Sequence, residues 1–310
     1  MPDNPDNPRV SVIITAHNRA TLLPRAVHSV LAQTYGDYEI VIVDDGSSDN
    51  TQAVISDFED PRIRSVRRKR SGGASAARNT GIRKSRGEYI AFLDDDDEWT
   101  PTKLERQVAI LDSSPPMVAM VYGWVDFVDD LTGDATHRER IVMEGDIFDN
   151  LVAMRTPGPT SVLMVRTSVA REINGFDESL PRHNDIDFIC RISRHYHIAL
   201  LPEVVLLHHG GHGHERISDN TPQSMSHAIS QLRRHMAAYA DELARRPKAH
   251  AAVLRSIAVM EFMCGNIRAS LAASVSSFKL DPAGVCRAFI TKWRTVASLL
   301  LNSLRKSSAK

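Results

Sequence analysis

The 310 residues are enough for one large domain and a smaller appendage. Hydrophobic residues make up 42% and charged residues 25%, and 38 basic residues balance 38 acidic ones, so no overall field attracts nucleic acid. No apolar run reaches the roughly 18 residues that span a bilayer. Three cysteines without a CxxC spacing predict reduced thiols and a cytoplasmic protein.

Strands and helices alternate along the first third of the chain. Residues 1–8 are polar, lack an apolar signal region and are expected to form a disordered tail. Apolar, β-branched runs then predict strands at 10–14, 39–43, 63–67 and 90–93, and helical patterns predict helices at 23–33, 50–58 and 72–84. This alternation is typical of a parallel sheet with right-handed crossovers.

The fourth predicted strand ends in an acidic cluster, Asp94 to Asp97, and Glu98 follows it. Like charges at this density repel, so they need a cation or direct contact with water. An EF-hand is excluded because its sixth position requires glycine and here holds Trp99. Two interpretations remain: a Mg²⁺ or Mn²⁺ ion shared with a diphosphate, or a solvated turn that caps the helix beginning near Thr102.

Polar residues follow three of the predicted strands at the point where each strand ends. They are His17 and Asn18, then Asp44 and Asp45, then Asp94 to Asp96. The carboxyl ends of parallel strands lie at the same edge of a sheet, and ligands bind in the crevice beyond that edge. The sequence therefore predicts that the three strand ends converge on one ligand site.

Several motifs, in this order, resemble the opening of the family 2 glycosyltransferases. They are the segments 10–19, 29–35, 43–49, 77–79, 87–90 and 93–96. The resemblance covers about the first two-thirds of the chain. It implies a GT-A fold, with a mainly parallel α/β sheet flanked by helices, and an inverting transferase that uses a nucleotide-activated sugar. One departure is His17, where the family usually has tyrosine.

The same resemblance implies roles for individual residues. It assigns Mn²⁺ or Mg²⁺ binding to Asp96, and nucleotide-sugar binding to Thr15, His17, Asn18, Asp45, Arg78, Asp94 and Asp95. A Gly-Phe-Asp segment followed by a Glu-Asp pair, whose Asp is the catalytic base in the family, corresponds to residues 175–177 and 184–185. Asp185 is therefore the implied base, and Asn184 replaces the glutamate.

Asp185 also has a second interpretation, as a carboxylate that only stabilises the start of a helix through the helix dipole. In either role, the positive end of the dipole predicts a low pKa for Asp185. A carboxylate of low pKa is a weak base, so proton transfer would come late in the reaction.

Two further runs of charged or titratable residues have competing interpretations. The glycine-rich segment 208–214 contains four histidines, and either His209 or His212 could bind a metal, or the segment could be a flexible loop near the site. The basic run 62–70 could attract a diphosphate. The alternation of Arg62 and Arg64 around Ile63 instead favours the exposed face of an edge strand.

After residue 112 the pattern becomes mixed, with strands expected at 117–124, 125–128 and 161–165. We expect a catalytic domain at 9–220, with a nucleotide-binding half at 9–112 and an acceptor half at 113–220, followed by a helical region at 221–310. The last predicted helix is basic and amphipathic. It either meets a membrane surface or packs on its neighbours through Phe289, Ile290, Trp293, Val296, Leu300 and Leu304.

Taken together, these features predict an inverting, metal-dependent glycosyltransferase of glycan or cell-surface polysaccharide synthesis. The donor is expected to be a UDP-sugar and the acceptor a glycan, a lipid-linked sugar or a small molecule. A sugar nucleotidyltransferase is one alternative, although the segment 15–19 lacks the glycines of a phosphate loop. A non-catalytic module that binds nucleotide sugars is the other, and Asn184 favours it.

Overall fold

The computed structural model describes residues 8–180, 182–210 and 221–286. The chain divides into two compact units, one formed by Met1–Leu151 and Arg155–Ile217 and the other by Val152–Met154 and Ser218–Lys310. The expected α/β class with C-terminal helices is confirmed. The division of the catalytic domain at residue 112 stays a prediction. Most of the expected N-terminal tail lies outside the described residues, and Pro8, its last residue, is buried.

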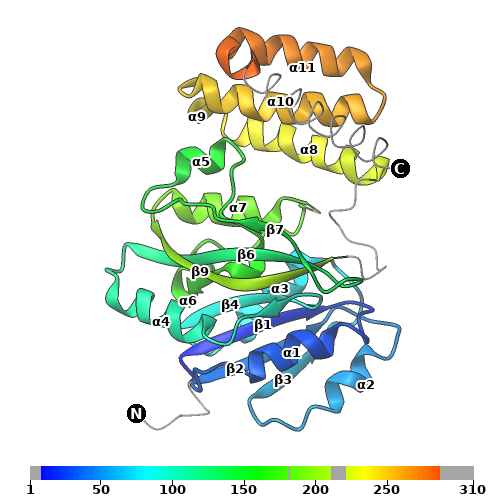
Figure 1. The fold of residues 1–310 in the computed structure, drawn as a ribbon, viewed down its shortest axis with the longest axis vertical. Coiled ribbons are helices and arrows are strands. Elements are labelled where there is room, and N and C mark those ends of the chain that lie inside the picture. Colours follow the sequence, from blue (N-terminus) through cyan, green and yellow to red (C-terminus); the bar gives the residue numbers. More distant parts are fainter. Residues whose placement is uncertain (1–7, 181, 211–220, 287–310) are drawn as a thin grey trace, which may run out of the picture. The chain divides into compact units, whose positions relative to one another are not determined.

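The described part of the first unit contains a sheet of nine strands (Figure 1). They pair in the order β3-β2-β1-β4-β8-β6-β9-β5, and β7 pairs with β6. The strands are β1 (Val10–Ala16), β2 (Tyr38–Asp44), β3 (Ile63–Arg67), β4 (Tyr89–Asp94), β5 (Glu98–Trp99), β6 (Val118–Asp129), β7 (Ala135–Glu139), β8 (Met164–Arg166) and β9 (His197–Gly210). The helices are α1 (Leu23–Leu31), α2 (Thr51–Ser56), α3 (Ala74–Lys84), α4 (Lys103–Ser113), α5 (Phe148–Val152), α6 (Thr167–Glu172) and α7 (Asn184–Ser193).

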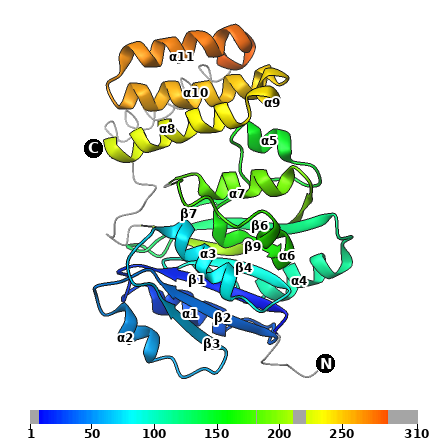
Figure 2. The ribbon, with the colours of Figure 1, turned by 180° about the vertical axis from the view of Figure 1, so that it is seen from behind.

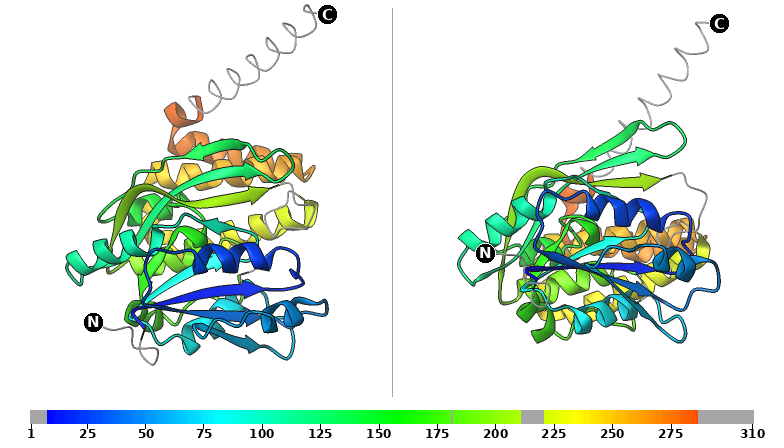
Figure 3. Two further views of the ribbon diagram at one scale, coloured as in Figure 1. Left: turned by 60° about the horizontal axis from the view of Figure 1, so that its bottom comes forward. Right: turned by 90° about the horizontal axis from the view of Figure 1, so that it is seen from below.

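The first four strands form the predicted parallel half, with β1 between β2 and β4. The opposite views of Figures 1 and 2 show α1 on one face of these strands and α3 on the other, and the turned views of Figure 3 agree. Covered strands of this kind are apolar on both faces, which explains the continuous β-branched runs. Gly81 lets α3 lie close to β1, because a Cβ at this position would fall 2.4 Å from a methyl carbon of Ile13.

The other half of the sheet is mixed, and two expectations about it are wrong. The strands expected at 117–124 and 125–128 are one long strand, β6, whose pairing with β9 shifts register between Tyr122 and Val125. The strand expected at 161–165 is a 3₁₀ turn, Thr160–Val162, followed by the short strand β8. The turn leaves Ser161 fully buried, with its hydroxyl beside the end of β4.

The histidine run is also different from its prediction as a flexible loop. His208, His209 and Gly210 belong to β9, and His208 and His209 pair in parallel with Phe127 and Val128 of β6. Backbone pairing with β6 therefore overrides the local effect of the glycines. His212 and the rest of the run lie outside the described residues.

The second unit is helical and contains α8 (Pro222–Ala238), α9 (Ala240–Ala244), α10 (Pro247–Met263) and α11 (Ile267–Leu280). Thr221 caps α8, because its hydroxyl accepts a hydrogen bond from the Ser224 amide. In this unit α10 lies between α8 and α11 (Figures 1 and 2). Across the described residues, every helix is too short or too polar to cross a membrane. The predicted last helix lies outside them.

Candidate functional site

The three polar strand ends lie side by side, as predicted. In the parallel register Thr15 of β1 is the partner of Asp94 of β4 and of Val43 of β2, and Ala16 is the partner of Asp44. Asn18, which has a positive φ of 54°, turns its side chain toward the loop after β2 and accepts a hydrogen bond from the Ser48 amide. The sheet edge therefore collects the polar groups of β1, β2 and β4 in one place.

Asp45 is buried and organises the loop that precedes α3. Its carboxylate accepts hydrogen bonds from the Ser71 hydroxyl at 2.8 Å and from the Gly72 and Gly73 amides at 3.0 and 2.8 Å, and it pairs with the Arg68 guanidinium. His17 Nδ1 lies 3.0 Å from the main-chain oxygen of Asp45, so the β1 end is joined to the same loop.

The basic run 62–70 divides into two parts in the structure. Arg62 and Arg64 lie on the edge strand β3 or beside it, as predicted. Their side chains are half-buried and pair with Asp60 and Glu39, so the expected exposed face is not confirmed. Arg67 and Arg68 instead turn to the end of β2, where they pair with Asp44 and Asp45. Sequence alternation missed this second role, because it reports which face of a strand a residue occupies and not where the strand ends.

Asp95 sits in the most crowded part of the acidic cluster. Burial, followed by the charge of Asp96, raises its pKa well above the ordinary aspartate value, although Arg19 lies 3.8 Å away. Its carboxyl group is therefore destabilised as an anion among like charges. A divalent cation at this edge would relieve that repulsion.

Arg78 of α3 connects the acidic cluster with the start of α7. Its guanidinium donates to Asp94 at 2.5 Å and to the side-chain oxygen of Asn184 at 3.4 Å, and it lies over the Phe176 ring. Asn184, which stands where the family motif has glutamate, thus contacts the positively charged guanidinium of Arg78. The predicted base, Asp185, is the next residue.

The prediction of a low pKa for Asp185 is wrong in direction. Burial is the largest effect and raises the pKa, while the Ile186 amide, which donates at 2.9 Å, and the charge of Arg78 oppose it. The helix dipole is a local effect that the sequence reveals, whereas burial comes from the fold around α7. A carboxylate of raised pKa is the stronger base, which is what a proton acceptor needs.

Asp97 and His208 form a buried pair that helps to hold the loop carrying the acidic cluster. Asp97 is fully buried, accepts a hydrogen bond from the Ser161 hydroxyl at 2.9 Å and lies 2.9 Å from His208 Nδ1. The Asp94 amide donates to the same hydroxyl at 3.1 Å. Ser161 and His208 therefore hold the loop after β4 in place, and neither contact has a local sequence signal.

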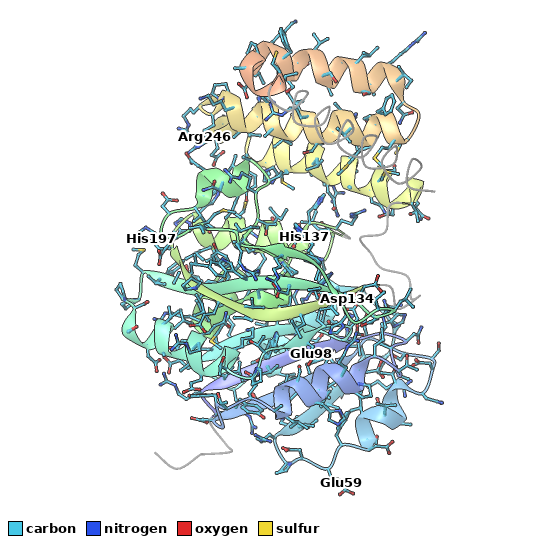
Figure 4. All side chains as sticks on the ribbon, viewed as in Figure 1. Glu59, Glu98, Asp134, His137, His197 and Arg246 are labelled. Atoms are coloured by element: carbon cyan, nitrogen blue, oxygen red, sulfur yellow. The ribbon has the colours of Figure 1, made fainter. Side chains whose placement is uncertain are left out.

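A second support involves His209 and α1. His209 Nδ1 lies 2.6 Å from Asp130, and its Nε2 lies 3.2 Å from Glu98, which is labelled in Figure 4. Arg25 of α1 donates to Asp130 at 3.0 Å and to the main-chain oxygen of Asp96 at 2.7 Å. The proposed metal ligand Asp96 is thus braced through its backbone by a residue that the sequence did not single out.

The chemistry of these side chains suits a hard divalent cation shared with a diphosphate. The described residues contain no group of three or more His, Cys, Asp or Glu side chains arranged to hold a metal without help. Mg²⁺ and similar ions, however, are commonly held by one or two carboxylates together with substrate phosphates. The crowded carboxylates of Asp94 to Asp96 fit that arrangement, and the role of His209 as a ligand stays a prediction.

The sequence is similar to those of known glycosyltransferases. Glycosyl transferase family 2 matches residues 11–173, which is more than half of the chain. An uncharacterized glycosyltransferase, alr2836, of Nostoc sp. PCC 7120 is 36% identical over 178 residues, 54% of each chain. The Escherichia coli UDP-Glc:alpha-D-GlcNAc-diphosphoundecaprenol beta-1,3-glucosyltransferase WfgD is 40% identical over 106 residues, 34% of this chain and 42% of WfgD. The chain spans about half the length of these curated relatives.

Solved structures show the same fold. Residues 1–349 of TarS from S. aureus, in complex with UDP-GlcNAc, match with a TM-score of 0.59 and 15% identity over 87% of this chain and 89% of that one. The mannosyltransferase PcManGT from Pyrobaculum calidifontis, in complex with GDP-Man and Mn²⁺, also matches with a TM-score of 0.59, at 20% identity over 94% and 84%.

Proposed function

Because the chain belongs to glycosyl transferase family 2, we propose that it moves a sugar from a UDP-sugar donor to an acceptor hydroxyl with inversion at the anomeric carbon. One observation carries the proposal. The parallel ends of β1, β2 and β4 bring to one edge the polar side chains that we propose to bind the donor, and Arg78 links that edge to the start of α7, where Asp185 lies.

The donor would be bound by the residues that the three strand ends present. We assign the nucleoside to Thr15, His17, Asn18 and Asp45, and the ribose and diphosphate side to Asp95, Asp94 and Arg78. Asp45 already accepts hydrogen bonds from Ser71, Gly72 and Gly73, so a base that donates to Asp45 must displace one of these donors or Arg68. Donor binding is therefore coupled to the loop before α3.

Asp96, assisted by Asp94 or Asp95, would hold Mn²⁺ or Mg²⁺ against the diphosphate. When bound, the ion supplies Lewis-acid neutralisation of the charge that grows on the leaving diphosphate. Arg78 would lie near the same diphosphate, because its guanidinium donates to Asp94.

Asp185 would accept the proton of the acceptor hydroxyl while that oxygen attacks the anomeric carbon from the face opposite the diphosphate. The raised pKa of Asp185 makes it the stronger base as the new bond forms. The barrier has oxocarbenium character, as in other glycosyl transfers. The acceptor belongs to the classes expected from the sequence: a glycan, a lipid-linked sugar or a small molecule.

The proposal can be tested by incubating the protein with radiolabelled UDP-sugars and Mn²⁺ without an acceptor. Slow release of UDP is the expected result, because water can replace the acceptor hydroxyl at a working transferase site. Release of UTP that depends on added pyrophosphate would instead show a nucleotidyltransferase. Donor binding without any release over many hours would show a non-catalytic module.

The bracing of Asp96 by Arg25 leads to a separate prediction. Arg25→Met keeps the aliphatic stem and removes both donor contacts, to Asp130 and to the Asp96 carbonyl. We expect the Mn²⁺ concentration for half-maximal UDP release to rise about tenfold, the lower end of the effect of losing an outer-shell contact at a metal site. Titration of UDP release with Mn²⁺ measures it.

A matched control is Arg106→Met, which removes an exposed ion pair with Glu203. This variant should keep the wild-type Mn²⁺ dependence. UDP binding in the absence of metal should be the same in both variants. If Arg25→Met leaves the Mn²⁺ requirement unchanged, Arg25 does not position Asp96.

A further inference from the structure

Helix α11 packs on α10 with its small polar side and turns its large apolar side outward. The Ser270 hydroxyl donates to the main-chain oxygen of Ala258 at 2.8 Å, and the fully buried Ser277 hydroxyl donates to that of Ala251 at 2.9 Å. An amphipathic helix of a globular protein normally does the reverse, with its apolar stripe facing the neighbour. The outward side of α11 is therefore built to contact something else.

That outward side is a continuous apolar stripe. Ile267, Leu271, Val275 and Phe278 follow the i, i+4, i+8, i+11 spacing of one helix face and are 48–60% exposed. Phe262, at the end of α10, is 63% exposed. With Val259 and Met263, these side chains account for seven of the ten large hydrophobic residues that are exposed in the described part of the chain. We call the four residues on α11, Ile267, Leu271, Val275 and Phe278, the α11 stripe.

The charges around the α11 stripe have one sign. Arg268 and Lys279 are the charged residues of α11, and both are exposed. Among the described residues from 262 to 286, Arg268 and Lys279 are the basic residues and Asp281 is the acidic one. Asp281 is buried and accepts a hydrogen bond from the Gly284 amide, so it does not offset the exposed positive charge.

We infer that the α11 stripe docks on an anionic lipid surface. A helix with large apolar residues on one face and basic residues beside them lies in the plane of a bilayer interface, with the apolar face among the acyl chains and the basic groups at the anionic headgroups. A protein partner or a second copy of the chain could bind through the apolar stripe alone and would not need the basic residues beside it. The one-signed charge of this region is the feature that selects an anionic surface.

Vesicle flotation with the full-length protein tests the inference. We expect the protein to bind vesicles that contain roughly 30% of the anionic lipid phosphatidylglycerol. It should bind little to vesicles made of zwitterionic phosphatidylcholine alone. Leu271→Glu should lower the partition coefficient at least tenfold, because it removes one buried side chain and adds a repelled charge. The double variant Arg268→Gln and Lys279→Gln should lower it roughly tenfold and reduce its salt dependence.

The matched control is Leu131→Glu, which changes an exposed leucine of the first unit, 82% exposed and outside the α11 stripe. It should bind vesicles like the wild type, and all three variants should keep the wild-type melting temperature and rate of UDP release. Equal vesicle binding by Leu271→Glu and Leu131→Glu would overturn the inference. A wild-type dimer that ignores vesicles and becomes monomeric in Leu271→Glu would show that a second copy covers the stripe.

The segment 287–310 provides the remaining alternative, because it could cover the stripe from within the same chain. In that case the wild type would bind neither kind of vesicle. Deletion of residues 287–310 would uncover α11 and increase the hydrogen exchange of its backbone amides. Either of these results would also overturn the inference.

Discussion

Asp96→Ala is expected to abolish metal-dependent turnover, with UDP release reduced by about a thousandfold or more. The proposed ion neutralises the leaving diphosphate, an effect of several kcal/mol, and about 4 kcal/mol corresponds to a thousandfold in rate. Asp96 is the carboxylate assigned to that ion, and its main-chain oxygen is held by Arg25. UDP release with and without Mn²⁺ is the measurement.

The fold should survive this substitution. Asp96 raises the pKa of the buried neighbour Asp95 through repulsion, so its removal relieves like-charge crowding. The melting temperature should therefore stay the same or rise. Glu59→Ala, at an exposed carboxylate far from the acidic cluster in the sequence and labelled in Figure 4, is the control and should keep full activity. Wild-type turnover by Asp96→Ala would refute the metal assignment.

Asp185→Asn should lower the transfer rate at least roughly a hundredfold, within the usual range for loss of a general base. The amide is the same size as the carboxylate and can still accept the hydrogen bond from the Ile186 amide, so the helix start is preserved. UDP affinity should change little, because the proposed nucleotide contacts lie at the ends of β1, β2 and β4 and at Arg78, which bonds to Asp94 and Asn184. Transfer kinetics and UDP binding are measured on the same preparation.

Asp187→Asn is the control for a helix-capping role, since Asp187 lies in the same first turn of α7 and pairs with Arg191. It should keep its activity and lose about 0.5 kcal/mol of stability at most, as for a helix ion pair. If Asp185→Asn instead unfolds the protein, or weakens UDP binding while transfer per bound donor is kept, Asp185 is structural and another group is the base.

The raised pKa of Asp185 also sets the sign of two pH effects. The base must be ionised, so activity should fall with decreasing pH at a higher pH than an exposed aspartate would give. A carboxyl group with a raised folded-state pKa destabilises the fold above the ordinary aspartate pKa of about 3.9, where the unfolded chain is ionised. Asp185→Asn should therefore be as stable as the wild type or more so at neutral pH, and the difference should vanish below about pH 4.

The parallel half of the fold and its polar edge were predictable, because their signals are local. Buried parallel strands are continuous apolar runs, and the polar residue after each run marks where the strand leaves the core. This is enough to place Asn18, Asp45 and Asp94 at neighbouring strand ends. The same reasoning failed at 117–128 and 161–165, where short apolar runs do not distinguish one long strand from two, or a strand from a turn.

The supports of the site depend on contacts between distant parts of the chain, which no local pattern encodes. Arg25 reaches Asp130 across 105 positions, and Asp97 meets His208 because β9 pairs with β5, which begins just after Asp97, as well as with β6. The pairing of β9 with β6 also makes His208 and His209 strand residues. Their backbone groups gain hydrogen-bond partners that an isolated glycine-rich segment would lack. Asp185 shows the same division: the helix dipole is visible in the sequence, but burial by the surrounding fold is the larger effect and decides the direction of its pKa.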